Sequence, residues 1–185
     1  MYPSATIPVK NSNFATMKAL RTLIYTICIS ALMCACKDNL PQPETTEAER
    51  TVIIYMMAEN SLNRFAANDL NEIRQAYANV PKNTNLLVYV DNSSLPIIYN
   101  VTAKKGLTEW KTFSQDQLST DSTVMQRTLK EITAKFPAKK YGLVLWSHGS
   151  GWVPRSRAIG IDNGKNTSSN NGLQMDITTL RGVLE

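Results

Sequence analysis

The sequence predicts an α/β fold with a largely parallel central sheet, and two observations support this prediction. Three near-continuous apolar runs, at residues 51–57, 85–90 and 141–147, are typical of strands that are buried on both faces. Between the first two runs, apolar residues recur at helical spacing. The order strand, helix, strand favours a right-handed crossover that makes the two strands parallel.

The first predicted unit starts with the strand at 51–57. Three polar residues after this strand offer a helix cap, namely Glu59, Asn60 and Ser61. Apolar residues then follow at helical spacing over 62–77, and Pro81 closes the unit. The second strand, at 85–90, ends at Asp91.

A hairpin and a second helix are predicted next. Residues 97–102 and 107–113 flank a short loop with a glycine at 106, which is typical of a β-hairpin. Asp121 offers the cap for a helix whose apolar residues extend over 124–136.

The third predicted strand, at 141–147, runs directly into His148. Residues 153–171 are rich in Gly, Asn, Ser and basic residues and are expected to form a loop, with a short strand at 158–161. A last helix is expected to start after one of two caps, Asp176 or Thr178. The chain ends inside this helix, so we expect that residues 51–185 are the N-terminal part of a domain.

The composition indicates a globular protein without a nucleic-acid partner. Hydrophobic residues make up 43% of the 185 residues and charged residues 19%, which is enough for a packed core. The net charge is +5, but the residues after position 35 contain 17 basic and 15 acidic side chains. This near balance excludes the basic surface that nucleic-acid binding needs.

The first 35 residues have the pattern of a bacterial signal peptide. A basic start at 17–21 precedes an apolar run at 22–33, which is too short to span a membrane. The run leads into Met-Cys-Ala-Cys, which resembles the lipobox of bacterial lipoproteins. We therefore predict a signal peptide at 1–35 with its true start at Met17, and a lipid anchor on Cys36.

Residues 36–50 are polar and contain prolines, so they are predicted to form a flexible tether between the anchor and the domain. The expected location is the cell envelope, with the lipid in the outer membrane or at the cell surface. Cys34 is the alternative lipid site, and an ordinary secretory signal or a buried N-terminal helix are the alternative interpretations. Cys28, Cys34 and Cys36 are all the cysteines of the sequence. The domain after residue 50 is therefore expected to have no disulfide, no cysteine metal site and no thiol nucleophile.

His148 is the only histidine, and the predicted strand places it at the carboxyl edge of the sheet, where ligands collect. Gly149 and Gly151 beside it allow close approach of backbone, and the Gly149 N–H is placed to donate to an oxyanion. A structural histidine in a glycine-rich turn is the alternative. His148 and Gly149 are therefore the candidate catalytic and oxyanion residues, and no metal ligands are predicted.

Two motifs resemble those of clostripain-like cysteine peptidases. Residues 51–62, Thr-Val-Ile-Ile-Tyr-Met-Met-Ala-Glu-Asn-Ser-Leu, look like the opening strand and loop of that family. Residues 143–152, Leu-Val-Leu-Trp-Ser-His-Gly-Ser-Gly-Trp, look like its histidine motif. The motifs and the elements between them also follow the family's order, so the resemblance covers residues 51–185.

The resemblance implies a caspase-like three-layer α/β/α sandwich, incomplete in this chain, and cleavage of protein or peptide substrates after Arg or Lys. His148 would match the histidine that moves protons between a thiol and the leaving amine, and Gly149 would match an oxyanion donor. The family's cysteine follows the next core strand, which lies beyond Glu185. The expectation is a truncated endopeptidase with the histidine but not the nucleophile.

The implied chemistry needs no cofactor, and calcium is expected by family analogy alone. Residues 162–164 resemble a piece of a calcium loop but lack the ligand spacing of an EF-hand, so a turn is predicted. Members of the family are often activated by cutting the loop after the histidine motif. Arg155, Arg157 and Lys165 are the candidate processing sites here, and solubility is their alternative role.

Two other functions fit the same residues. An α/β-hydrolase uses His-Gly-x-Gly after a strand as an oxyanion hole, but it also needs a later Gly-x-Ser-x-Gly elbow. Residues 149–151 do not supply this elbow, so the nucleophile of this alternative would lie beyond Glu185. An inactive lipoprotein fragment or a binding protein is the non-catalytic alternative.

Overall fold

The computed structural model describes residues 47–151, 157–164 and 171–185. The predicted signal peptide, Cys36 and most of the predicted tether lie outside these residues, as do Arg155 and Lys165. The described elements follow in the order β1 (Arg50–Met57), α2 (Asn63–Ala76), η1 (Tyr77–Asn79), β2 (Thr84–Asp91), β3 (Ile97–Thr102), β4 (Gly106–Thr112), α3 (Ser122–Lys135), β5 (Tyr141–Trp146), β6 (Ala158–Asp162), β7 (Leu173–Asp176) and α4 (Ile177–Leu184).

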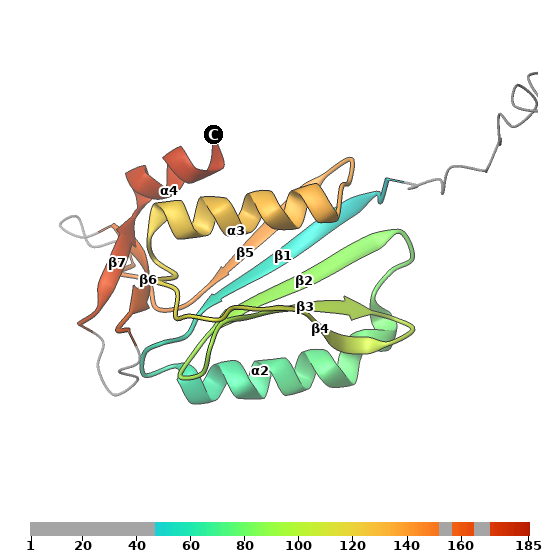
Figure 1. The fold of residues 1–185 in the computed structure, drawn as a ribbon, viewed down its shortest axis with the longest axis horizontal. Helices are drawn as coiled ribbons and strands as arrows, with labels where there is room; N and C mark the ends of the chain where they lie inside the picture. The colour runs from blue at the N-terminus through green and yellow to red at the C-terminus, as the bar shows by residue number, and fades with distance from the viewer. Residues whose placement is uncertain (1–46, 152–156, 165–170) are drawn as a thin grey trace, which may run out of the picture. The chain divides into compact units, whose positions relative to one another are not determined.

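The central sheet has the strand order β4-β3-β2-β1-β5. β1 is parallel to both β2 and β5, and β3 and β4 add antiparallel strands beyond β2. α2 covers one face of this sheet and α3 the other (Figure 1). The predicted parallel unit, the hairpin and the three-layer α/β/α arrangement are therefore confirmed.

β1 lies in the middle of the core because both of its faces are covered. Tyr55 and Met57 pack on the side of α3, and Tyr55 stacks on Tyr89 of β2 with 4.4 Å between ring centroids. Met56 alternates to the other face and packs on the side of α2. This two-sided burial explains why the sequence of β1 is almost continuously apolar.

β5 is less buried than the sequence predicts. Its apolar run suggested burial on both faces, but Tyr141 is 51% exposed and Val144 is 47% exposed. Among the described strands, β5 pairs only with β1, so it forms one edge of the sheet. An apolar sequence cannot bury a strand unless a neighbour and a helix cover it.

The start of α2 also differs from the prediction. The residue at its N-cap is Leu62, which makes no side-chain cap hydrogen bond, so none of the three predicted capping residues caps the helix. The other helices start as expected: Asp121 accepts from two backbone N–H groups at the start of α3, and Asp176 does the same for α4. Asp121 and Asp176 are a stronger sequence signal for a cap than the polar residues before α2, because each aspartate directly precedes the first helical residue.

β6 and β7 form a separate antiparallel pair. The strand expected at 158–161 is confirmed as β6, whereas β7 was not predicted because four residues, Leu-Gln-Met-Asp, give little periodicity. None of the described helices is long and apolar enough to cross a membrane.

Candidate active site

The carboxyl ends of β1, β2 and β5 are in register, since Met57 pairs with Asp91 and Met56 pairs with Trp146. Residues that follow these strands therefore meet at one edge of the sheet, as expected for an open α/β fold. Trp146 fixes the end of β5 to α2 because its Nε1 donates to Asp69 at 2.7 Å. The next residues along the chain are Ser147 and His148.

Asn60 joins three segments at this edge. Its buried side-chain amide donates to the carbonyl of Met57 at 2.9 Å, the hydroxyl of Ser147 at 3.3 Å and the carbonyl of Ile161 at 2.7 Å. Its side-chain oxygen accepts from the N–H of Leu62 at 2.9 Å. The end of β1, the residue before His148 and β6 are thus fixed to one another by a single side chain.

His148 is half-buried, and its ring is oriented from the start of α2. The Nε2 atom lies 3.0 Å from the hydroxyl of Ser61. The other ring nitrogen, Nδ1, makes no hydrogen bond within the part of the chain that the structure describes. An imidazole held in this way has one oriented nitrogen and one nitrogen that can exchange a proton with a substrate or a nucleophile.

Gly149 is exposed, and its backbone geometry suits an oxyanion donor. It forms an antiparallel bridge with Ile159. The two hydrogen bonds of this bridge belong to the flanking residues: Gly160 donates to the carbonyl of His148 and Ser150 donates to the carbonyl of Ala158. In such a pair the N–H of Gly149 points away from β6, so it is available to a ligand.

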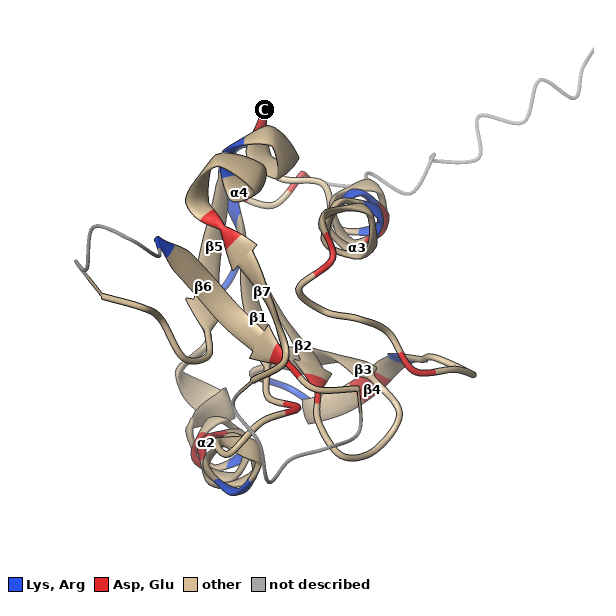
Figure 2. Ribbon diagram, turned by 90° about the vertical axis from the view of Figure 1, so that its left-hand side faces the viewer, with Lys and Arg blue, Asp and Glu red and all other residues tan. Residues whose placement is uncertain are grey.

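A second group of polar residues at the same edge is acidic. The carboxylate oxygens of Glu59, Asp91 and Asp116 lie within 4.8 Å of one another, and acidic segments (red) come together near the ends of β1 and β2 in Figure 2. Glu59 and Asp91 are fully buried, and Asp116 is exposed. Burial, which is the largest cause, and the nearby charges of Asp162 and Glu59 together raise the pKa of Asp91 to about 9.

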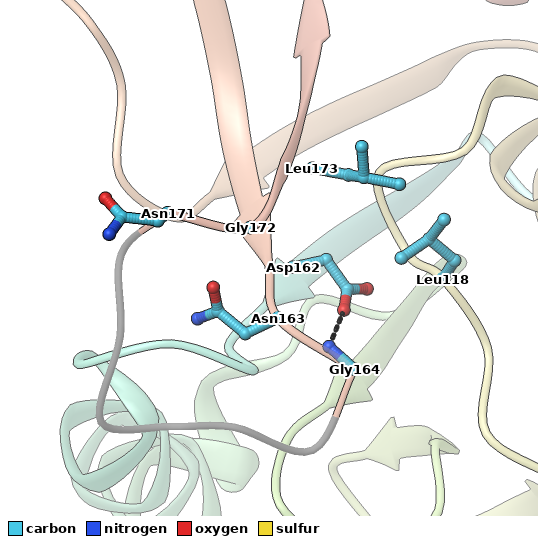
Figure 3. A pocket seen from close by; sticks show the side chains of 7 residues that line it. All are labelled: Leu118, Asp162, Asn163, Gly164, Asn171, Gly172 and Leu173. Atoms are coloured by element: carbon cyan, nitrogen blue, oxygen red, sulfur yellow. Dashed lines mark hydrogen bonds between the residues drawn. The ribbon is translucent and has the colours of Figure 1, made fainter.

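Asp162 has a structural role beside this group. One of its carboxylate oxygens accepts from the N–H and the hydroxyl of Ser119, and the other accepts from the N–H of Gly164 at 3.0 Å. The bond to Gly164 closes the predicted turn, and it borders an open pocket of about 510 Å³ (Figure 3). Both carboxylate oxygens of Asp162 are therefore already used by protein donors.

The structure brings His148 and Gly149 to the carboxyl edge, as the sequence predicts, while Arg157 is exposed just before β6. Three roles were not predicted from the sequence. Asn60 and Ser61 were interpreted as caps, but they fix the chain around His148. The buried pair of Glu59 and Asp91 was not recognised, although carboxylates at or just after the carboxyl ends of two neighbouring parallel strands are a signal for a site.

Comparisons with known proteins agree with this arrangement. The chain matches the model of peptidase C11, the clostripain family, over residues 54–185. A cysteine protease from B. fragilis is 36% identical, with a TM-score of 0.52 over 57% of this chain and 93% of that chain. A secreted C11 cysteine protease from Bacteroides thetaiotaomicron, solved with an irreversible peptide inhibitor, is 36% identical, with a TM-score of 0.63 over 74% of this chain and 39% of that chain.

An inactive zymogen C11 protease from Parabacteroides distasonis is 31% identical, with a TM-score of 0.53 over 59% of this chain and 33% of that chain. The chain therefore spans well under half of the length of the last two relatives. A search of curated proteins found no match.

The central sheet with helices on both faces is the fold of the caspase-like cysteine peptidases, as these solved relatives show. The chain belongs to one family within this class, the clostripain family.

Proposed function

We propose that this chain is the histidine-bearing part of a cysteine endopeptidase that cleaves after Arg or Lys. The observation that supports the proposal most is the position of His148 at the carboxyl edge, with one nitrogen held by Ser61 and the exposed Gly149 N–H directed away from β6. Residues 47–185 contain no cysteine, so the nucleophile of this proposal comes from another part of the whole protein.

In the proposed mechanism, the thiolate attacks the carbonyl carbon of the scissile bond. Gly149 N–H donates to the oxyanion that forms, which stabilises the transition state more than the ground state. His148 gives a proton to the departing amine, and it then takes a proton from the water that hydrolyses the acyl-enzyme. Ser61 holds the ring in position through Nε2, which leaves Nδ1 for these transfers.

The substrate class is tested with fluorogenic peptides that differ only in the residue before the scissile bond. We expect the whole protein to cleave Arg and Lys peptides with a kcat/KM at least about 100-fold higher than for Leu or Asp peptides. A pocket that pairs with a cationic side chain leaves its own polar groups unpaired when Leu binds, and it repels Asp. Equal rates for all four peptides would contradict the specificity, and no cleavage of any peptide would contradict the peptidase function.

Loop cleavage is proposed as the activating step, with Arg155, Arg157 and Lys165 as the sites. The match to almost the whole of the shorter B. fragilis protease chain supports a division of such proteins into separate chains. Replacing all three residues by alanine is expected to keep the whole protein as one chain on a denaturing gel.

The matched control replaces two exposed basic residues of the β3–β4 loop, Lys104→Ala and Lys105→Ala, and is expected to be cut like the wild type. A triple variant that still separates into two chains removes the proposal.

We also propose that the protein is exported and held at the cell envelope through a lipid on Cys36. The leader pattern supports this, and one relative is a secreted protease. The proposed peptide chemistry uses no cofactor, because a thiol and an imidazole suffice. Calcium, which the resemblance implies, is proposed to act on the structure and not in the chemical steps.

A further inference from the structure

Basic side chains gather at the end of the domain where β1 and β2 begin. Four connections lie there (Figure 1), namely residues 47–50, 77–83, 103–105 and 135–140. We call their exposed surface the basic face. It carries two acidic residues, Glu47 and Glu49, and seven basic ones, Arg50, Lys82, Lys104, Lys105, Lys135, Lys139 and Lys140, all of them exposed.

The connections at the carboxyl ends of the strands have the opposite charge. Residues 58–62, 92–96, 113–121 and 147–151 contain three acidic residues and neither Lys nor Arg. The near balance of charge in the sequence therefore conceals a separation along the strand direction. β1 has eight residues, so about 25 Å separates the basic face from the edge that holds His148.

Ion pairs within the domain do not account for the basic face. Lys139 pairs with Glu49 at 2.6 Å, and the other six cations form no ion pair with a described residue. An exposed pair of this kind contributes little to stability, and like charges on one face repel one another. A negatively charged surface outside the protein would relieve this repulsion.

Apolar groups lie among these cations. Tyr77 and Tyr141 are 37% and 51% exposed, at the start of the connection to β2 and at the start of β5. An open hollow of about 350 Å³ beside Arg50 has apolar side chains in its lining, including Val80 and Leu86. Cations, tyrosines and apolar surface together are typical of protein surfaces at the boundary between lipid headgroups and acyl chains.

We propose that the basic face binds the anionic phospholipids of the membrane that carries the lipid anchor, with the His148 edge directed away from it. Ten residues separate Cys36 from Glu47, so the tether spans at most about 35 Å and enters the domain at this face. Each Lys or Arg near an anionic membrane adds to the attraction, and the acidic edge is repelled. The membrane location rests on the anchor proposed above, whereas binding by the basic face does not require the lipid.

The test uses the whole protein beginning at Lys37, which carries no lipid. Its binding to vesicles of phosphatidylethanolamine and phosphatidylglycerol is compared by sedimentation with binding to neutral phosphatidylcholine vesicles. We expect at least about tenfold tighter binding to the anionic vesicles, and loss of most of this binding between about 50 mM and 500 mM NaCl, because salt screens exposed charges. The readout depends neither on lipidation nor on peptidase activity, so its failure is distinguishable from failure of either earlier proposal.

Two double variants locate the surface. Lys82→Gln with Lys140→Gln is expected to weaken binding to anionic vesicles by about tenfold or more. The matched control is Arg64→Gln with Arg127→Gln, at exposed positions in the first turn of α2 and the first half of α3. It changes the net charge by the same amount and is expected to bind within about twofold of the wild type.

Equal binding to anionic and neutral vesicles, or binding to neither, overturns the proposal. An equal loss in the two double variants also overturns it, because net charge and not the basic face would then be responsible. Tighter binding to duplex DNA than to anionic vesicles overturns it in favour of a nucleic-acid partner.

Discussion

Replacing His148 by alanine is expected to reduce the kcat/KM of the whole protein for Arg and Lys peptides by about 1,000-fold or more. His148 is the only imidazole in the chain, and its Nδ1 is the ring nitrogen without a described hydrogen bond. Without it, the proposed thiol loses the imidazole that takes up its proton and gives one to the amine. The rate is measured with a fluorogenic Arg peptide, with folding monitored by circular dichroism.

A comparison with Ser61→Ala separates chemistry from positioning. This variant keeps the imidazole but removes the hydroxyl that lies 3.0 Å from Nε2. We expect a smaller loss, about tenfold, because the hydrogen bond orients the ring but the imidazole that transfers the proton is kept. Wild-type activity in His148→Ala would exclude His148 from the catalytic machinery.

Replacing Asn60 by alanine is expected to lower the free energy of unfolding by about 3 kcal/mol. The change removes four hydrogen bonds and leaves the buried carbonyls of Met57 and Ile161 without this donor. Each buried group left unpaired costs about 1–3 kcal/mol, partly offset by relaxation and water. Urea unfolding of the variant and the wild type measures the difference.

Two further measurements make this prediction specific. Asn79→Ala, in the exposed 3-10 turn after α2, is the matched control and is expected to change stability by less than about 0.5 kcal/mol. Asn60→Ala is also expected to lower kcat, because Ser147, the residue before His148, loses a contact that holds it. Equal stability of the two variants would show that Asn60 does not fix this edge.

Much of the fold follows from local sequence patterns. The apolar run of β1 and the aspartates that cap α3 and α4 are signals within a few residues, and the structure confirms each of them. The prediction was wrong at β5 because burial depends on neighbours from distant parts of the chain. Tyr141 and Val144 are apolar, yet they are about half exposed because β5 has one described neighbour.

The candidate site, like the fold, has features that the sequence predicts and features that depend on distant parts of the chain. The sequence alone determined the α/β class, the position of His148 after a strand and the resemblance to the clostripain family, since these depend on periodicity and on short motifs. Only the tertiary structure showed that Ser61 contacts His148, which lies 87 positions later in the sequence. The same holds for the hydrogen bond from the Asn60 side chain to the carbonyl of Ile161, 101 positions later. The grouping of Glu59, Asp91 and Asp116 likewise needed three dimensions. Hydrogen bonds and charge interactions depend on distances in space, and parallel strands bring together residues that the sequence keeps far apart.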